Sequence, residues 1–151
     1  MASEPSTDQL KRELRDAALK LLGRRDHSSK ELTDKLAQRG FDGQLIEHVL
    51  AELSQSGLHS EQRYAESYAR QRAMKAYGPL RIQAELAQRG LSREQISEAL
   101  NALDIDFAEQ ARSFYLRKYR QPISDYGEKV RRNQAMARRG FTGEHLRGLL
   151  D

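Results

Sequence analysis

The chain contains one heptapeptide three times: Lys35-Leu36-Ala37-Gln38-Arg39-Gly40-Phe41, Glu85-Leu86-Ala87-Gln88-Arg89-Gly90-Leu91 and Ala135-Met136-Ala137-Arg138-Arg139-Gly140-Phe141. The three Arg-Gly pairs place their glycines at positions 40, 90 and 140, so the repeat has a strict period of fifty residues. Self-similarity at a fixed interval is the sequence signature of a repeat architecture. We therefore expect three units of similar structure along the 151 residues.

Each copy of the heptapeptide has the pattern of a helix C-terminus. In the first copy, Leu36 lies three residues before Arg39 and is expected on an inward apolar stripe. Arg39 falls in the last turn, where a cation suits the helix macrodipole, and Gly40 follows at the position that favours a left-handed backbone. Phe41 is then placed to pack back on the helix that ends there.

Apolar residues at three- and four-residue steps predict three helices in each unit. Capping boxes are predicted at Ser28 and Ser92, an N-cap at Ser60, a first helical residue at Pro79, and a last helix opening at Thr142. No alternating strand pattern occurs, so the predicted fold is all-α with nine helices. The predicted division is a disordered tail over residues 1–7 and three-helix repeats over residues 8–57, 58–103 and 104–151.

Composition restricts the class of protein. The chain is 38% hydrophobic and 32% charged, which is typical of a soluble, helix-rich protein. No apolar run approaches the ~20 residues of a membrane span, and the N-terminus lacks the basic and apolar regions of a signal peptide. The absence of cysteine fits a reducing compartment. We expect a cytoplasmic protein, and a monomer because no exposed heptad seam is visible.

The positive charge is concentrated in the C-terminal half. The formal net charge is +4, and the stretch Arg112–Arg139 holds nine basic residues against two acidic ones. Such a gradient indicates an anionic partner, most simply nucleic acid. The alternative is a solvated basic surface without a ligand.

The sequence shows no motif in which residues capable of catalysis or metal binding have the spacing of an active site. There is no glycine-rich loop ending in Lys-Ser/Thr, so no P-loop for ATP is predicted. The four histidines show no i, i+4 pairing. Acidic residues such as Glu31 and Glu85 are predicted to form ordinary i, i+4 ion pairs with Lys35 and Arg89 on the helix surface. We predict no enzyme activity, no metal and no cofactor.

All six tyrosines lie beside basic residues in the second and third units. Aromatic side chains among cations can stack on bases and bind phosphates, although core tyrosines with a solvated hydroxyl are commoner. We expect core positions for Tyr64, Tyr68 and Tyr115, and exposure for Tyr77, Tyr119 and Tyr126. The glycine-containing turns also fit a helix-turn-helix DNA reader, but such readers are usually dimers, so sequence-specific repression is the less favoured alternative.

Further motifs accompany the heptapeptides along the chain. They lie in residues 17–41, then at Arg63-Tyr64-Ala65, Tyr68, Arg72, Tyr77-Gly78-Pro79, Ile82, Glu85-Leu86 and Arg89-Gly90, and then at Lys118-Tyr119 and Arg138-Arg139-Gly140-Phe141. This combination resembles the bacterial RecX family over residues 10–151. The usual phenylalanine of this family is replaced here by Tyr64 and Tyr68.

The resemblance implies a non-enzymatic modulator of RecA with three tandem three-helix units in an elongated, curved body. Proteins of this family bind in the groove of the RecA–single-stranded DNA filament. They restrain filament extension, ATP hydrolysis, strand exchange and co-protease action, and so act in recombination, DNA repair and the SOS response. RecA and single-stranded DNA are the expected partners, with double-stranded DNA as an alternative ligand.

Two faces are hypothesised on this basis. The second unit contacts RecA through Arg63, Arg70, Arg72, Tyr77 and Arg81. The basic cluster of the third unit lies nearer the DNA and consists of Arg117, Lys118, Arg120, Lys129, Arg131 and Arg132. Because Arg72 shares a helix stripe with Tyr64 and Tyr68, an internal ion pair is the alternative for that side chain. The rival functions are DNA binding without RecA, and an adaptor whose basic surface is incidental.

Overall fold

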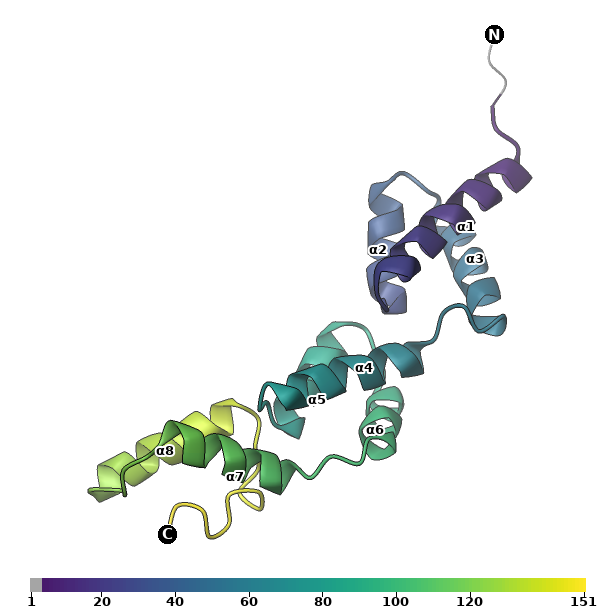
Figure 1. Cartoon of the computed structure of the whole chain (residues 1–151). Helices are drawn as coiled ribbons and strands as arrows, with labels where there is room; N and C mark the ends of the chain where they lie inside the picture. The colour runs from purple at the N-terminus through teal and green to yellow at the C-terminus, as the bar shows by residue number, and fades with distance from the viewer. Residues whose placement is uncertain (1–3) are drawn as a thin grey trace.

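The computed structural model describes residues 4–151 and is built from α-helices, with no strand in that range. The all-α prediction is confirmed. The helices follow one another along an elongated body, in the order α1–α3, α4–α6 and α7–α8 (Figure 1). Their bounds are α1 Thr7–Arg24, α2 Ser29–Gln38, α3 Gly43–Gln55, α4 Glu61–Met74, α5 Pro79–Gln88, α6 Arg93–Ala102, α7 Phe107–Lys118 and α8 Tyr126–Arg138.

The ninth helix predicted from Thr142 is wrong, because the described chain contains eight helices and residues 143–149 form turns. Within that segment, Leu146 donates its N–H to the carbonyl of Gly143, three residues back. Gly148 has a φ of 75°, which lies outside the helical region. Two glycines, both of low helix propensity, therefore keep this segment in turns.

The first helix is longer than the sequence pattern indicated. It begins at Thr7, inside the predicted tail, because the Ser6 side chain caps it by accepting the Gln9 N–H. It also continues through Gly23 to Arg24. The part of the predicted disordered tail at residues 1–3 lies outside the described residues.

The predicted N-terminal signals of the other helices are confirmed. Ser28 and Ser92 both form complete capping boxes, Ser60 caps α4, and Pro79 is the first residue of α5. The serine side chains accept backbone N–H groups that have no partner within the helix, and the proline has no N–H that would need one.

The apolar residue three positions before the arginine of each heptapeptide is fully buried, one in each of three separate cores. Leu36 lies in the core of α1–α3, Leu86 in that of α4–α6, and Met136 in that of α7, α8 and the C-terminal turns. The glycines of the heptapeptides have φ angles of 92°, 92° and 100°. After each glycine the next residue donates its N–H to the carbonyl of the buried residue, as Phe41 does to Leu36 over 3.3 Å. This is the Schellman ending expected from the sequence.

The end of α8 meets the start of α5, and the two backbones form hydrogen bonds with each other. Gly78 donates its N–H to the carbonyl of Arg139 over 2.6 Å, and Leu80 donates to the carbonyl of Gly140 over 3.0 Å. The orphan N–H groups of one helix start therefore satisfy carbonyls beyond the end of another. A Cβ on Gly78 would lie 2.3 Å from the carbonyl carbon of Gly140, so only glycine permits the contact.

The side chain of Arg139 closes the same junction. Its Nε donates to the carbonyl of Ala76 over 2.9 Å, and its terminal nitrogen donates to the carbonyl of Lys75 over 2.7 Å. Its guanidinium lies 4.4 Å from the ring centre of Tyr77 and 4.1 Å from that of Phe114. Arg139 therefore joins the second and third repeats while it caps the end of α4.

The junction of α5 with α2 follows the same end-to-end plan but relies on side chains. Glu61 accepts the N–H of Ser29 over 2.5 Å, and the Lys30 ammonium donates to the carbonyl of Gln88 over 3.2 Å. The buried His59 ring lies 3.0 Å from the carbonyl of His27. Both junctions therefore place the Arg-Gly end of one repeat at the start of the second helix of the repeat before it.

We predict that Gly140→Ala destabilises the protein more than Gly40→Ala does. Both substitutions place alanine in a left-handed conformation, at about 1–2 kcal/mol each. At Gly140 the new Cβ would also lie 2.5 Å from the N of Arg81, whereas at Gly40 nothing lies within 4 Å. The clash is expected to add about 1–3 kcal/mol. Urea unfolding of the two variants measures the difference, and equal losses would contradict the close packing at this junction.

Candidate functional site

The carboxylate of Glu85 on α5 is the centre of a polar cluster between α4 and α5. It accepts the Tyr68 hydroxyl over 2.6 Å and two nitrogens of Arg72 over 2.9 and 2.7 Å. Arg81, one turn before it on α5, donates over 3.2 Å. Burial by itself would raise the pKa of Glu85, but the hydrogen bonds from Arg72 and Tyr68 hold it below its ordinary value.

The ring of Tyr77 is surrounded by three guanidinium groups. Arg72 lies 3.9 Å from its centre, and Arg81 and Arg139 each lie 4.4 Å from it. Arginine over an aromatic face is attracted by the ring quadrupole and remains able to donate hydrogen bonds at its edge. The loop that enters α5 is therefore held by cations from both the second and the third repeat.

The same arrangement extends toward the first repeat. Arg89 lies 4.5 Å from the ring centre of Tyr68 and donates to the Tyr64 hydroxyl over 3.0 Å. Its guanidinium is 3.9 Å from Glu31, which pairs with Arg25 at 2.7 Å. Burial raises the pKa of the Tyr64 hydroxyl to about 12, so this group remains a neutral hydrogen-bond partner.

We call this set of side chains the arginine–tyrosine row. It contains side chains from all three repeats, and its five arginines outnumber its two carboxylates, so the row carries an excess of positive charge. Its members are Arg25, Glu31, Tyr64, Tyr68, Arg72, Tyr77, Arg81, Glu85, Arg89 and Arg139.

The residues predicted to contact RecA fall into two groups. Arg72, Tyr77 and Arg81 belong to the arginine–tyrosine row, and the alternative of an internal ion pair is confirmed for Arg72. Arg63 and Arg70 are exposed and lie seven residues apart, on the outward side of α4. Arg63 donates to the carbonyl of Gly57 over 2.7 Å, so it also stabilises the start of its own helix. The structure therefore does not bring the five residues together on one face.

The residues predicted to contact DNA are exposed with one exception. Arg132 is 5% exposed, donates to the Tyr115 hydroxyl and to the carbonyl of Gln121 over 2.9 Å each, and pairs with Glu128. A guanidinium fixed in this way is not offered to a phosphate, so the DNA-contacting role predicted for Arg132 does not fit its position. The exposed members are Arg117, Lys118, Arg120, Lys129 and Arg131, of which only Lys129 lies near a carboxylate within residues 4–151.

Sequence reasoning underestimated the two arginines of the later heptapeptides. Arg89 and Arg139 were interpreted as last-turn cations, and the fifty-residue spacing was the signal that both occupy equivalent junctions. The predicted pairs Glu31–Lys35 and Glu85–Arg89 are wrong. Glu31 pairs instead with Arg25, from the loop before α2. Glu85 pairs with Arg72, which the packing of α4 on α5 brings close, and with Arg81 one turn earlier on the same helix.

The tyrosine predictions are mostly confirmed. Tyr64 and Tyr115 are buried and Tyr68 is half-buried, while Tyr126 is 79% exposed. The two remaining tyrosines, Tyr77 and Tyr119, are half-buried rather than exposed, because arginines cover their rings.

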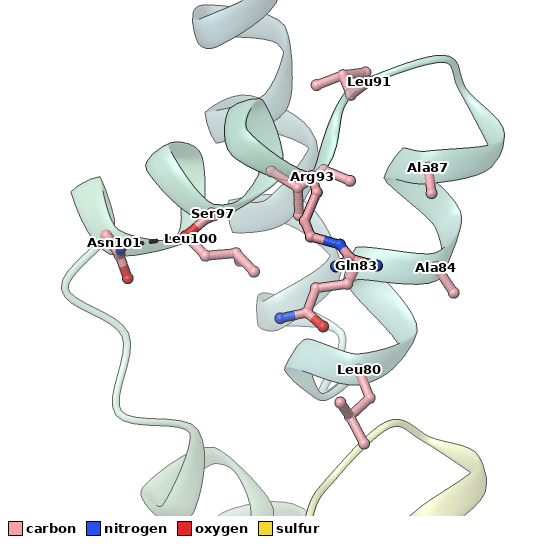
Figure 2. Close-up of a pocket in the computed structure, with 10 residues that line it drawn as sticks. Leu80, Gln83, Ala84, Ala87, Leu91, Arg93, Ser97, Leu100 and Asn101 are labelled. Carbon is pink, nitrogen blue, oxygen red and sulfur yellow. Dashed lines mark hydrogen bonds between the residues drawn. The ribbon is translucent and has the colours of Figure 1, made fainter.

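A separate groove of about 630 Å³ opens between α5 and α6. Figure 2 shows Leu80, Leu91 and Leu100 around it, with Arg93 as the one charged side chain among its lining residues. Leu80 is 52% exposed although its backbone N–H is held by the third repeat. An apolar groove with a polar rim suits side chains of a protein partner better than phosphates.

Two kinds of site are not found in the described part of the chain. Among residues 4–151, no three histidine, aspartate or glutamate side chains gather in a way that would hold a metal ion. None of the described helices is both long enough and apolar enough to span a membrane.

Comparison with protein families gives two adjoining matches. Residues 15–53 match the family "RecX, first three-helix domain", and residues 60–100 match "RecX, second three-helix domain". The "Regulatory protein RecX" of Halorhodospira halophila (strain DSM 244 / SL1) is 42% identical over 135 residues, which span 89% of this chain and 84% of that protein. That of Ectopseudomonas mendocina (strain ymp) is 45% identical over 140 residues, which span 89% of this chain and 93% of that protein.

A solved structure shares the fold. The crystal structure of RecX from Lactobacillus salivarius aligns with a TM-score of 0.81 at 22% identity, over 93% of this chain and 94% of that one. The elongated helical array is therefore found in both molecules.

We predict that Glu85→Gln lowers stability more than Glu52→Gln. Glu85 accepts hydrogen bonds from Arg72, Arg81 and Tyr68, and the substitution leaves the half-buried Arg72 without its charge partner. The expected loss is about 1–2 kcal/mol, and a smaller loss is expected for the more exposed pair of Glu52 with Lys11. The free energies of unfolding in urea at neutral pH measure both. Equal losses would show that the cluster adds nothing beyond a surface ion pair.

Proposed function

The chain belongs to the RecX family of regulatory proteins, and on that premise we propose that it regulates the RecA–single-stranded DNA filament. It acts by binding and without catalysis, and it restrains filament extension, ATP hydrolysis, strand exchange and co-protease activity. The observation that carries the proposal is the end-to-end array itself. Three small repeats, joined through their helix ends, present separate surfaces at successive positions along one body.

The mechanism follows from the spacing of these surfaces. Successive repeats would contact successive RecA protomers in the filament groove, each through a modest interface. Linked contacts of this kind give high avidity when their spacing matches that of the partner. Because the backbones of α5 and α8 bond to each other, a body bound to two protomers resists the relative movement that hydrolysis and strand exchange require.

We assign the protein contact to the second repeat and the DNA contact to the third. The second repeat offers the exposed Arg63 and Arg70 on α4 and the apolar groove between α5 and α6. Arg72, Tyr77 and Arg81 belong to the arginine–tyrosine row, which joins α4 to α5 through Glu85. A protein that binds RecA on DNA would act in the cytoplasm, which is the location we propose.

The DNA contact consists of cations with little internal compensation. Arg117, Lys118, Arg120 and Arg131 are exposed and form no ion pair within residues 4–151, and Lys129 lies 3.9 Å from Asp151. Unpaired surface cations favour a polyanion, because binding it releases counterions from the phosphates. A DNA-binding protein that acts without RecA is the second candidate, supported by this cluster alone.

We expect the protein to inhibit the single-stranded-DNA-dependent ATPase of RecA at substoichiometric ratios. An array that bridges or caps protomers affects many subunits for each molecule bound. The measurement is a titration of this protein into RecA on saturating single-stranded DNA. Inhibition that requires enough protein to coat the DNA would instead favour the second candidate, and no inhibition at any ratio would remove RecA as the partner.

The paired substitutions Arg120→Glu and Arg131→Glu are expected to weaken DNA binding in the absence of RecA. Each lost phosphate contact should reduce the slope of log affinity against log salt by about 1. The matched control is Arg12→Glu with Lys20→Glu, which changes the charge equally at exposed positions of α1. Equal effects of the two double variants would mean that net charge, rather than the third repeat, determines binding.

A further inference from the structure

A shallow hollow of about 370 Å³ lies where α4 and α7 both end, at the junction of the second and third repeats. Met74, the last residue of α4, is 77% exposed beside it, an unusual position for a large apolar side chain. Phe114 on α7 is half-buried and forms part of its lining. We call this feature the junction hollow, and its remaining lining residues are Lys75, Ala76, Arg117 and Lys118.

The cations around the junction hollow are free of carboxylates. Lys75, Arg117 and Lys118 are all exposed, none of them forms an ion pair within residues 4–151, and no acidic residue lines the hollow. The backbone carbonyls of Lys75 and Ala76 at the end of α4 accept hydrogen bonds from Arg139, so they are not available to these cations. The hollow therefore combines an apolar lining with an uncompensated positive rim.

That combination selects among anionic ligands. A DNA duplex presents phosphates but keeps the faces of its bases stacked inside, so it leaves Met74 and Phe114 unused. A single strand presents phosphates together with flat apolar base faces, which stack on such side chains without regard to sequence. An acidic peptide would match the charge, but it offers a flat group only where it carries an aromatic side chain, whereas every nucleotide of a single strand carries one.

We propose that the junction hollow binds one base of single-stranded DNA against Met74 and Phe114, with the flanking phosphates held by Lys75, Arg117 and Lys118. The proposal rests on the DNA contact assigned to the third repeat. It extends that contact across the junction to the end of α4, and it predicts a preference for single strands over duplex DNA. Arg139 acts as a positioning residue, since its guanidinium lies 4.1 Å from the Phe114 ring centre and fixes the ring beside α4.

The test compares two ligands of equal charge and length, a labelled oligothymidylate and an abasic deoxyribose-phosphate oligomer, by fluorescence anisotropy with the full chain and no RecA. The wild-type protein should bind the oligothymidylate more tightly. Met74→Ser should weaken that binding at least about fivefold and leave the abasic oligomer unaffected. Lys75→Gln should weaken both ligands alike. Leu58→Ser, at another exposed apolar residue, should change neither.

Four results would overturn the proposal. Equal affinity of the wild-type protein for both oligomers would mean that no base is bound, and an equal effect of Met74→Ser on both would mean that the residue acts indirectly. Poly-glutamate that competes as well as the oligothymidylate would show that charge alone is recognised. If neither oligomer binds while the RecA ATPase is still inhibited, the junction hollow and the DNA contact both fail, and regulation of RecA stands.

Discussion

The contact between Gly78 and Gly140 is the constraint on which the arrangement of the second and third repeats depends. Two backbones approach so closely that neither residue tolerates a Cβ, and the N–H groups that start α5 bond to the carbonyls that follow α8. Helix ends normally require capping side chains or water to satisfy these groups. Here the N–H groups at the start of α5 and the carbonyls after α8 satisfy each other, so these hydrogen bonds rather than apolar burial define the geometry of the junction.

Arginine side chains reinforce the junctions that the backbones define. Arg139 closes one of them and Arg89 approaches the other, and both come from the same position of the heptapeptide. A guanidinium can stack on a ring and donate hydrogen bonds in its plane at the same time, which a lysine does not do. This explains how Arg139 contacts Tyr77 and Phe114 while it caps α4. Small cores of marginal size are thus joined by polar side chains along their edges.

The positive charge divides into two kinds with different consequences. Arginines of the arginine–tyrosine row are committed to carboxylates, rings and carbonyls, so they hold the repeats together. Cations of the third repeat such as Arg117 and Arg131 lack carboxylate partners within the described residues, so they remain available to an anion. Composition alone does not separate these classes, because Arg131 and Arg132 are adjacent in the chain and one is exposed while the other is buried.

The sequence by itself determined the fold class, the fifty-residue repeat, the helix ends at Gly40, Gly90 and Gly140, and the capping boxes. The helix ends and the capping boxes depend on residues close together in the chain, where backbone geometry and side-chain type decide the outcome, and the fold class and the repeat follow from periodicities along the whole sequence. The family resemblance was also readable from local motifs, and the comparisons confirm it.

Only the tertiary structure decided which cations pair and which are free. Glu85 bonds to Arg72, thirteen residues away, rather than to Arg89 one turn later, and Arg132 is buried on a helix whose pattern placed it with exposed neighbours. Sequence periodicity places a side chain on a face, but the partner across that face comes from a distant part of the chain.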